Sequence, residues 1–298
     1  MTVQRAATQR ASKSPTPLGN RRVTGKEQYY TPVELAEKLT REVLSVVGSF
    51  EGRVVLEPAG GTGAFIQAAK SLGAEAFVSF DIDPKFAGVI RGDFLQQSLR
   101  LENSIAISNP PFGRNNSLSI PFFNKAADHS EFICFIVPRS WRKWSVLNRL
   151  DRRFELVADH DIVIDYVDDQ GAHISRQLLL KTCFQIWRRL PAGKTRPIYR
   201  VRDTGLVTKV RPEEADVALR VFGFNCGRVF EEFEPLPNST LMFLKLNDER
   251  VLPALLSADF EKFFKNTAYT EALSLQEINY LLNEAIHGDP LLEEVRTA

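Results

Sequence analysis

The stretch Arg53-Val54-Val55-Leu56-Glu57-Pro58-Ala59-Gly60-Gly61-Thr62-Gly63-Ala64-Phe65 contains an apolar run, a glycine-rich turn and the start of a second apolar run. The first run is typical of a buried parallel strand, and the second predicts a helix that continues to about Leu72. Glycines at such a turn permit close approach of a ligand to the backbone, which is how open α/β sheets bind nucleotide-like cofactors. Close packing of the helix on the strand would explain them as well, so the turn alone is weak evidence.

Two acidic segments follow. The apolar run Ala76–Phe80 ends in Asp81-Ile82-Asp83-Pro84. An acid at the end of the second strand is placed to accept hydrogen bonds from both ribose hydroxyls of an adenosine group, so Asp81 is the candidate for that contact, with Asp83 as a helix cap. In Gly92-Asp93-Phe94-Leu95, the acid would bind the exocyclic amine of an adenine and the aromatic ring would face it. Asp93 is equally consistent with an ordinary turn residue.

A third apolar run, Ile105–Ile107, leads into Ser108-Asn109-Pro110-Pro111-Phe112-Gly113. The side-chain oxygen of Asn109 and the carbonyl of Pro110 can each accept one N–H, which would localise the lone pair of an amino group conjugated to a ring. The prolines have no N–H and fix φ, so no donor competes beside that carbonyl. Phe112 offers a flat face for a base lifted out of its stack. The motif therefore predicts a site that activates a poorly nucleophilic amine.

The alternation of strands and helices continues beyond this motif. Phe122–His129 suits a helix, Phe132–Val137 a fourth buried strand and Thr182–Trp187 the last strand. Phe154–Val157 and Ile162–Tyr166 are weaker candidates for two more strands. Strands and helices that alternate with short links predict a doubly wound, mainly parallel sheet.

Two further segments frame this pattern. Gln28-Tyr29-Tyr30-Thr31-Pro32 precedes a helical repeat of apolar residues, with Thr31 in the N-cap position and Pro32 at the first helical position. Later, Pro138-Arg139-Ser140-Trp141-Arg142-Lys143-Trp144 forms a basic turn that carries aromatic rings. Such a turn suits contact with the backbone or bases of a nucleic acid, although tryptophan in this position more often packs.

The charges are segregated along the 298 residues, although the formal net charge is only +1. Basic residues occur before any acid at the N-terminus, and the stretch 188–211 is basic with Asp203 as its only acid, whereas the last third is acidic. Separated charge of this kind indicates a nucleic-acid partner, although a charged run is as often a solvated face. The N-terminal residues could be a transit peptide, but they lack an apolar stripe, which favours a disordered basic arm.

The cysteines Cys134, Cys183 and Cys226 are far apart and form no C-x-x-C pair, which is typical of reduced thiols in a cytosolic or nuclear protein. No secretion signal and no apolar segment of membrane-spanning length is recognised. We therefore expect a cytoplasmic, nucleoid-associated location, or the host-cell cytoplasm for a viral protein.

The ordered set of motifs resembles the S-adenosylmethionine-dependent amino-methyltransferases, and most closely the N6-adenine DNA methyltransferases of gamma motif order. The resemblance covers roughly residues 27–190. The matching segments are Gln28 to Pro32, Leu56 to Phe65, Asp81, Asp93-Phe94, Asn109 to Phe112 and Phe184 to Trp187. Gly60 departs from the family, which often has Cys there, and this difference is expected to be harmless because the backbone is what approaches the cofactor.

The resemblance implies a Rossmann-like, class I methyltransferase fold: an α/β fold with a doubly wound, mainly parallel seven-stranded sheet. We expect residues 1–26 to form the basic arm, 27–190 the catalytic domain, and 191–298 a small C-terminal α+β domain that recognises nucleic acid. In that last domain the sequence predicts helices over Pro212–Arg220, Val251–Phe264 and Leu275–Ala285, and strands around Leu241–Leu246.

The resemblance also implies site residues and the cofactor S-adenosylmethionine. The cofactor would be bound by Tyr30, Thr31, Pro32, Glu57, Pro58, Ala59, Gly61, Gly63, Asp81, Ile82, Asp93, Phe94 and Asn109. The catalytic residues would be Asn109, Pro110, Pro111 and Phe112, and the substrate would contact Phe112, His173, Arg139 and Trp141. His173 stands in for the family's late aromatic residue and is equally consistent with an ordinary loop histidine. No metal is expected, because Asp159, His160, Asp161, Asp165 and Asp168 lack a recognisable ligand spacing.

The implied reaction is methyl transfer to the N6 amino group of adenine in DNA, with double-stranded DNA as the expected partner and no membrane. The short C-terminal domain suggests modest sequence specificity, or a partner subunit that supplies it. Alternatives are an RNA adenine, a protein glutamine, cytosine N4, or a catalytically silent DNA-binding subunit. Restriction protection, phage defence and regulation all remain open as biological roles.

Overall fold

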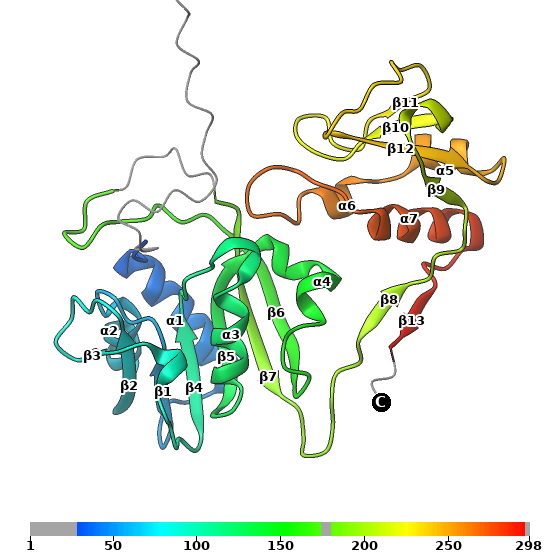
Figure 1. Ribbon diagram of the computed structural model, residues 1–298. Coiled ribbons are helices and arrows are strands. Elements are labelled where there is room, and N and C mark those ends of the chain that lie inside the picture. The colour runs from blue at the N-terminus through cyan, green and yellow to red at the C-terminus, as the bar shows by residue number, and fades with distance from the viewer. Residues whose placement is uncertain (1–28, 174–179, 296–298) are drawn as a thin grey trace, which may run out of the picture.

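The structure is a computed structural model that describes residues 29–173 and 180–295 (Figure 1). A larger N-terminal lobe surrounds a seven-stranded sheet, and a smaller C-terminal lobe surrounds a four-stranded sheet. A two-stranded ribbon of β8 (Tyr199–Val201) and β13 (Leu292–Glu294) lies at the base of the C-terminal lobe. None of the helices in these described ranges has both the length and the apolar character needed to cross a bilayer.

The N-terminal lobe alternates strands and helices in the way the sequence predicts. Its strands are β1 (Val54–Glu57), β2 (Ala76–Asp81), β3 (Ile90–Arg91), β4 (Ser104–Ser108), β5 (Ser130–Pro138), β6 (Phe154–Ile162) and β7 (Thr182–Arg189). Its helices are α1 (Val33–Val47), α2 (Ala64–Ser71), α3 (Ser119–Ala126) and α4 (Trp144–Leu147), with 3-10 turns η1 (Phe94–Gln96), η2 (Arg114–Asn116) and η3 (Arg139–Arg142).

The strand order is β3-β2-β1-β4-β5-β7-β6, and β1 to β5 run parallel while β7 is antiparallel to both of its neighbours. The carboxyl ends of β1, β2, β4 and β5 therefore lie along one edge of the sheet. Thr182, at the start of β7, is opposite Pro138, at the end of β5, so β7 begins at this same edge. We call it the carboxyl edge. Ligands bind at this edge in open α/β sheets.

The sheet is buried on both faces, which explains why its central strands are almost continuously apolar. Ile105 and Ile107 of β4 pack with α1 and α2 on one face, whereas Ala106 packs on the other face with α3. Phe123 of α3 contacts the rings of Trp141 and Trp187 edge-on, with ring centroids 5.6 and 5.4 Å apart. These packed faces hold the carboxyl edge in place.

The C-terminal lobe packs its sheet, in the order β11-β10-β12-β9, against helices. The elements are β9 (Val207–Lys209), η4 (Pro212–Glu214), β10 (Val217–Arg220), β11 (Val229–Phe230), β12 (Leu241–Leu246), α5 (Val251–Ser257), α6 (Glu261–Phe264) and α7 (Leu275–His287). The helix expected over Pro212–Arg220 is wrong, because Val217 to Leu219 are buried in a strand that pairs with β11 and β12. Tertiary pairing overrides the helical pattern here.

Three local predictions in the N-terminal lobe also differ from the structure. Strand β6 replaces the two strands expected over Phe154–Val157 and Ile162–Tyr166, because it pairs with β7 along its whole length around one irregularity. Helix α1 begins at Val33 with Pro32 as N-cap and no side-chain cap, so Thr31 has another role. Residues 84–93 form no helix that Asp83 could cap, and Asp83 instead pairs with Lys85 and Arg91.

The two lobes contact each other at the ends of β5 and β7. The ring of Trp144 stacks on that of Tyr280 at a centroid distance of 5.5 Å. Lys143 Nζ lies 3.1 Å from Oε1 of Glu277, whose side chain is buried. Lys181 donates its backbone N–H to the carbonyl of Ala268 at 2.7 Å. Part of the basic, aromatic turn that the sequence suggested for nucleic acid therefore holds the lobes together.

Candidate active site

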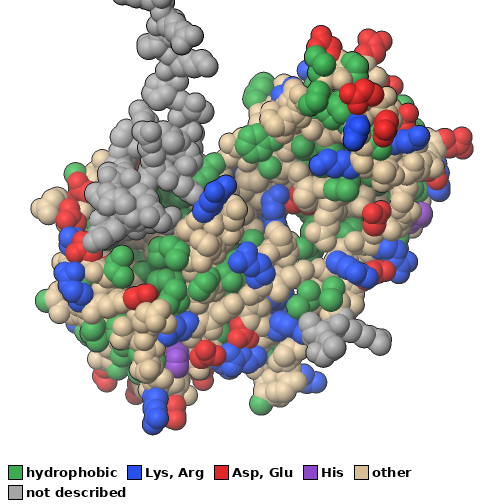
Figure 2. Space-filling view, viewed as in Figure 1, with side chains coloured by type: hydrophobic (Ala, Val, Ile, Leu, Met, Phe, Trp, Pro, Cys, Tyr) green, Lys and Arg blue, Asp and Glu red, His purple; other side chains and the backbone are tan. Residues whose placement is uncertain are grey.

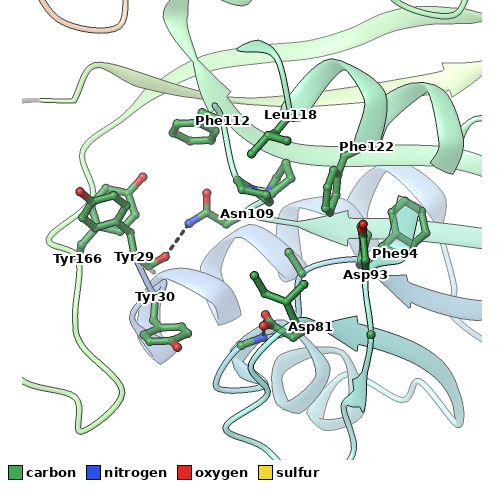
Figure 3. A pocket seen from close by; sticks show the side chains of 17 residues that line it. Tyr29, Tyr30, Asp81, Asp93, Phe94, Asn109, Phe112, Leu118, Phe122 and Tyr166 are labelled. Carbon is green, nitrogen blue, oxygen red and sulfur yellow. Dashed lines mark hydrogen bonds between the residues drawn. The ribbon is translucent and has the colours of Figure 1, made fainter. Parts of the chain in front are cut away.

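A cavity of about 270 Å³ opens at the carboxyl edge, beside the ends of β1, β2 and β4 (Figure 3). It is lined by Tyr29, Tyr30, Pro58, Ala59, Gly61, Asp81, Ile82, Gly92, Asp93, Phe94, Asn109, Pro110, Pro111, Phe112, Leu118, Phe122 and Tyr166. A smaller cavity of about 30 Å³ shares part of this wall and adds Thr31, Glu57, Gly60, Thr62, Ala64 and Phe65. Residues predicted from five separate segments thus meet around one cavity.

The three glycines of the turn have different roles. Gly61 has φ of +44°, and a Cβ there would lie 2.6 Å from the ring of Tyr30, which covers the turn. Gly63 is the N-cap of α2 in the left-handed conformation, and a Cβ there would collide with the ring of Phe86. Gly63 therefore serves packing and does not line either cavity, whereas Gly61 lines both.

The structure explains why position 60 is a glycine, which the sequence did not reveal. A Cβ at this position would lie 2.2 Å from the hydroxyl oxygen of Ser79 and 2.8 Å from a methyl group of Val89. Side chains of β2 and of the following turn fill the space that a cysteine would need. The chain can therefore have no side chain larger than hydrogen here without moving Ser79 or Val89.

Two carboxylates line the side of the cavity formed by β2 and η1. Asp81 accepts the backbone N–H groups of Gly61 at 2.8 Å and Asp83 at 2.7 Å, which fixes its orientation at the end of β2. Asp93 accepts from the N–H of Leu95 at 2.9 Å and so caps η1 while it lines the cavity. Asp93 is thus a turn residue and a cavity residue at once.

Glu57 is buried beneath the smaller cavity at the end of β1. One of its carboxyl oxygens accepts hydrogen bonds from the hydroxyl of Ser108 and from the N–H of Ala59. Burial raises the pKa of Glu57 to about 8, because the charged form loses its water, and the two hydrogen bonds offset only part of this effect. The carboxyl group is therefore mainly neutral at pH 7.

Tyr30 lines both cavities and keeps its phenolic proton. Burial, followed by the negative charges of Asp81, Asp169 and Asp83, raises the pKa of Tyr30 to about 12. Its backbone pairs with Val167 in an isolated bridge, with the N–H of Tyr30 3.1 Å from the carbonyl of Val167. This bridge brings the segment after β6 to the cavity.

The side chain of Asn109 is oriented by two acceptors. Its Nδ2 donates to the carbonyl of Tyr29 at 3.4 Å and to the hydroxyl of Thr31 at 3.2 Å. Because a carbonyl can only accept, the side-chain nitrogen must face Tyr29, and the side-chain oxygen points the other way. Figure 3 shows this oxygen directed away from Tyr29 and toward the side of the cavity where Phe112 lies. Thr31 therefore positions Asn109 and does not cap α1.

Three aromatic rings stand beside Asn109: Phe112, Tyr29 and Tyr166. The rings of Tyr29 and Tyr166 contact each other at a centroid distance of 5.4 Å with an interplanar angle of 53°. Sequence reasoning missed both tyrosines as site residues. The position of Tyr29 next to Tyr30 was an available signal, whereas Tyr166 reaches the cavity through the pairing of Val167 with Tyr30, which no local pattern reveals.

The other predicted substrate contacts lie elsewhere. His173 does not line the cavity; its Nδ1 is 3.2 Å from Asp165, and its side chain is exposed. Trp141 is completely buried and donates its indole N–H to Ser119 at 3.2 Å, so its ring cannot reach a substrate in this structure. Arg139 is paired with Asp161 at 2.9 Å. Packing thus occupies the side chain of Trp141, and an ion pair occupies that of Arg139.

The acidic residues around β6 are also engaged. Arg142 binds Asp159 and Asp161, with nitrogen–oxygen distances of 2.6 and 2.7 Å. Within residues 29–173 and 180–295, no three His, Cys, Asp or Glu side chains gather in a way that could hold a metal ion.

No family model and no curated protein matches the chain. Among solved structures, a protein from Pyrococcus horikoshii provisionally named an RNA methyltransferase is 23% identical, with a TM-score of 0.45 over 55% of this chain and 89% of that one. A provisionally named class I S-adenosylmethionine-dependent methyltransferase from Listeria monocytogenes is 13% identical, with a TM-score of 0.40 over 56% of this chain and 62% of that one.

The modification subunit of a provisionally named type I restriction enzyme from Vibrio vulnificus is 13% identical, with a TM-score of 0.38 over 57% of this chain. The chain spans about half of that subunit, 49% of its length. Two of these three solved structures are thus named as methyltransferases. The seven strands in the order β3-β2-β1-β4-β5-β7-β6, with β7 antiparallel to its neighbours, form the doubly wound, mainly parallel sheet that the sequence predicts.

Proposed function

We propose that the chain transfers a methyl group from S-adenosylmethionine to the N6 amino group of an adenine in DNA. The orientation of Asn109 carries this proposal. Its amide oxygen is turned toward Phe112, in a cavity whose opposite wall is the glycine turn with Asp81. An acceptor fixed in this way suits a flat substrate that presents an N–H group.

The residues of the larger cavity fit the cofactor. Gly61 lets the ring of Tyr30 lie directly against the turn at the cavity wall, since any side chain there would strike the ring. Asp81 and Asp93 line this cavity and would accept the ribose hydroxyls and the adenine amine, and Phe94 and Ile82 add apolar wall. When bound, the cofactor supplies an electrophilic methyl group on a sulfonium. We assign the contacts with its methionine end to Tyr30, Thr31 and Glu57, on the side of the smaller cavity.

Asn109 and Pro110 would act on the target amine by accepting its two N–H groups. This removes the lone pair from conjugation with the ring and directs it at the methyl group, and positioning of this kind accounts for much of the rate. The methylated nitrogen is acidic enough to lose its extra proton to water, so no strong general base is needed. Consistent with this, Asn109 is held by a carbonyl and a hydroxyl rather than by a titratable group.

The three rings around Asn109 favour an aromatic substrate over a glutamine side chain. Phe112, together with Tyr29 and Tyr166, provides flat faces that an extruded base would stack on, and base–aromatic stacking is worth about 1–3 kcal/mol per base. In this proposal Tyr166 or Tyr29, in place of His173, faces the base across from Phe112. A glutamine amide poses the same chemical problem but would not need this much aromatic surface.

Identification of the methylated product tests the proposal. The protein is incubated with radiolabelled S-adenosylmethionine and, separately, with duplex DNA, an RNA of the same sequence and a glutamine-containing peptide, and each polymer is digested and separated. We expect label in N6-methyladenine from DNA. Label only in RNA or in glutamine would overturn the substrate assignment, and label in N4-methylcytosine would overturn the assigned base.

A further inference from the structure

The C-terminal lobe carries two arginines on neighbouring strands. Arg220 ends β10 and Arg228 directly precedes β11; the N–H of Arg220 is 2.8 Å from the carbonyl of Arg228. Both guanidinium groups lie against the ring of Phe230, at 5.7 and 4.9 Å from its centroid. The two like charges therefore occupy one face of the strand pair, where they repel each other.

Among residues 29–173 and 180–295, neither Arg220 nor Arg228 has an ion-pair partner, although Glu231 and Glu232 follow directly after β11. By contrast, Arg200, Arg202 and Arg250 of the same part of the chain are all paired with acids. Two unpaired guanidinium groups side by side are suited to an anion supplied from outside the chain, such as a phosphate.

An aromatic residue projects from the turn that joins these arginines. Phe224 is 86% exposed and Phe222 is 48% exposed. The turn is nevertheless fixed by two of its own residues. The side chain of Cys226 is buried, and Gly227 packs so closely on Phe260 that a Cβ would lie 2.8 Å from that side chain. The N–H groups of Cys226 and Arg228 also bond within the turn, to the carbonyls of Gly223 and Asn225 at 3.1 Å each. The side chain of Phe224 is therefore exposed to water on a turn that is fixed by packing and hydrogen bonds.

The turn lies on the side of the C-terminal lobe that contacts the carboxyl edge. The N–H of Gly223 bonds to the carbonyl of Glu271 at 3.0 Å, and Phe222 bridges to Ala272. The same segment, residues 268–272, is bonded to Lys181 before β7 and to Lys143 after β5. The space-filling view shows hydrophobic side chains, with Lys and Arg nearby, on this lobe above the hollow between the lobes (Figure 2).

We propose that the turn 222–228 binds nucleic acid, with Arg220 and Arg228 on a backbone phosphate and Phe224 stacked on a base. This inference rests on the proposed function for the choice of polymer, and it assigns that polymer a second binding surface outside the catalytic cavity. A polyanion with flat aromatic faces matches both features of the turn. A protein partner with an apolar groove would use Phe224 but would leave the arginine pair without an anion.

The test is direct binding, measured apart from methyl transfer. Anisotropy of a fluorescein-labelled duplex is recorded against salt for the full chain and for Phe224→Ala, and for the double variant Arg220→Gln with Arg228→Gln. We expect Phe224→Ala to weaken binding roughly 5- to 100-fold, as removal of one stacked base would. The double variant should lower the slope of log K against log salt by about 0.9, because the two arginines share one phosphate and each neutralised phosphate adds about 0.9 to that slope.

Leu256→Ala and Arg250→Gln are the matched controls, because Leu256 is also exposed in this lobe and Arg250 is paired with Asp248. Both should bind like the unmodified chain, and thermal unfolding should be the same for all variants. The inference is overturned if Phe224→Ala and the double variant bind DNA like these controls. It is also overturned if these variants differ from the controls only in binding to a protein partner. The two proposals fail separately, because DNA binding without methyl transfer by the unmodified chain would count against the proposed function alone.

Discussion

The two halves of the cavity are built in different ways. On the cofactor side, Gly61, Asp81 and Asp93 lie at the ends of consecutive strands and turns and are fixed by bonds between backbone and carboxylate. On the acceptor side, Asn109 is fixed by residues about 80 positions earlier, and Tyr166 arrives from a segment nearly 60 positions later. The first half depends on local turns, whereas the second depends on tertiary pairing. Substitutions in the two halves should therefore be separable in their effects.

Asn109→Ala should break the acceptor half most severely. Loss of the oriented amide oxygen is expected to lower kcat by roughly 100- to 1,000-fold, the range seen when one positioned hydrogen-bonding group is removed from a transition state. Cofactor affinity, measured by isothermal titration calorimetry, should change little. If kcat survives, the role assigned to this side chain is incorrect.

Glu57→Gln tests the buried link between the halves, since Glu57 at the end of β1 accepts from Ser108, which precedes Asn109. The folded-state pKa is about 8 against an ordinary value of 4.5, so the folded protein binds the extra proton between these values. The stability that this proton provides is present below about pH 4.5 and is lost as pH rises through 8. The variant should thus lack this loss and become more stable than the unmodified protein at about pH 8, by on the order of a few kcal/mol.

Urea unfolding at several pH values, with the partly exposed Glu37→Gln as control, measures this difference. The curves of Glu57→Gln and the unmodified protein should converge at low pH and diverge at mildly alkaline pH. Parallel curves over the whole range would mean that the carboxyl group titrates normally.

Asp81→Asn should weaken the cofactor half alone. A hydrogen bond to a charged group contributes about 1.5–3 kcal/mol, so the dissociation constant for S-adenosylmethionine is expected to rise roughly 10- to 150-fold. At saturating cofactor, kcat should stay near that of the unmodified protein. Asp83→Asn, which removes a carboxylate paired with Lys85, is the matched control and should have a smaller effect on affinity.

Tyr166→Ala should act on the substrate while leaving cofactor affinity unchanged. Loss of one stacking surface predicts an increase in KM for DNA of about 5- to 100-fold, and Tyr166→Phe, which keeps the ring, should restore most of it. Equal loss in both variants would point to the hydroxyl rather than to stacking.

Thr31→Val is expected to have the smallest effect. It removes one of the two acceptors of Asn109 Nδ2 but leaves the carbonyl of Tyr29, so kcat should fall by roughly 2- to 10-fold, the value of one neutral hydrogen bond. Thr31→Ser should recover activity because it keeps the hydroxyl group. An unchanged rate for the valine variant would show that Tyr29 alone orients the amide.

The sequence was sufficient for the sheet and for the meeting of Gly61, Asp81 and Asp93 at one cavity, because strands, glycine turns and the acids that follow them are contiguous. It was not sufficient where distant residues share space. Gly60 makes sense only once Ser79 is seen to fill its side-chain volume, and Trp141 belongs to the core because Phe123 and Ser119 surround it. Tyr166 is recognised as a cavity residue only from the bridge between Val167 and Tyr30. Val217–Arg220 joins a sheet although its local pattern is helical.

The side chain of Glu277 contacts the N-terminal lobe and also takes part in the cap of α7. Glu277 accepts the N–H of Ser274 at 2.7 Å in a capping box at the start of α7, while its other oxygen contacts Lys143 of the N-terminal lobe. Separation of the lobes would therefore strip α7 of an interaction that orients its cap and leave a buried negative charge without its cation. Denaturation should accordingly proceed as a single cooperative transition, in which neither lobe melts ahead of the other.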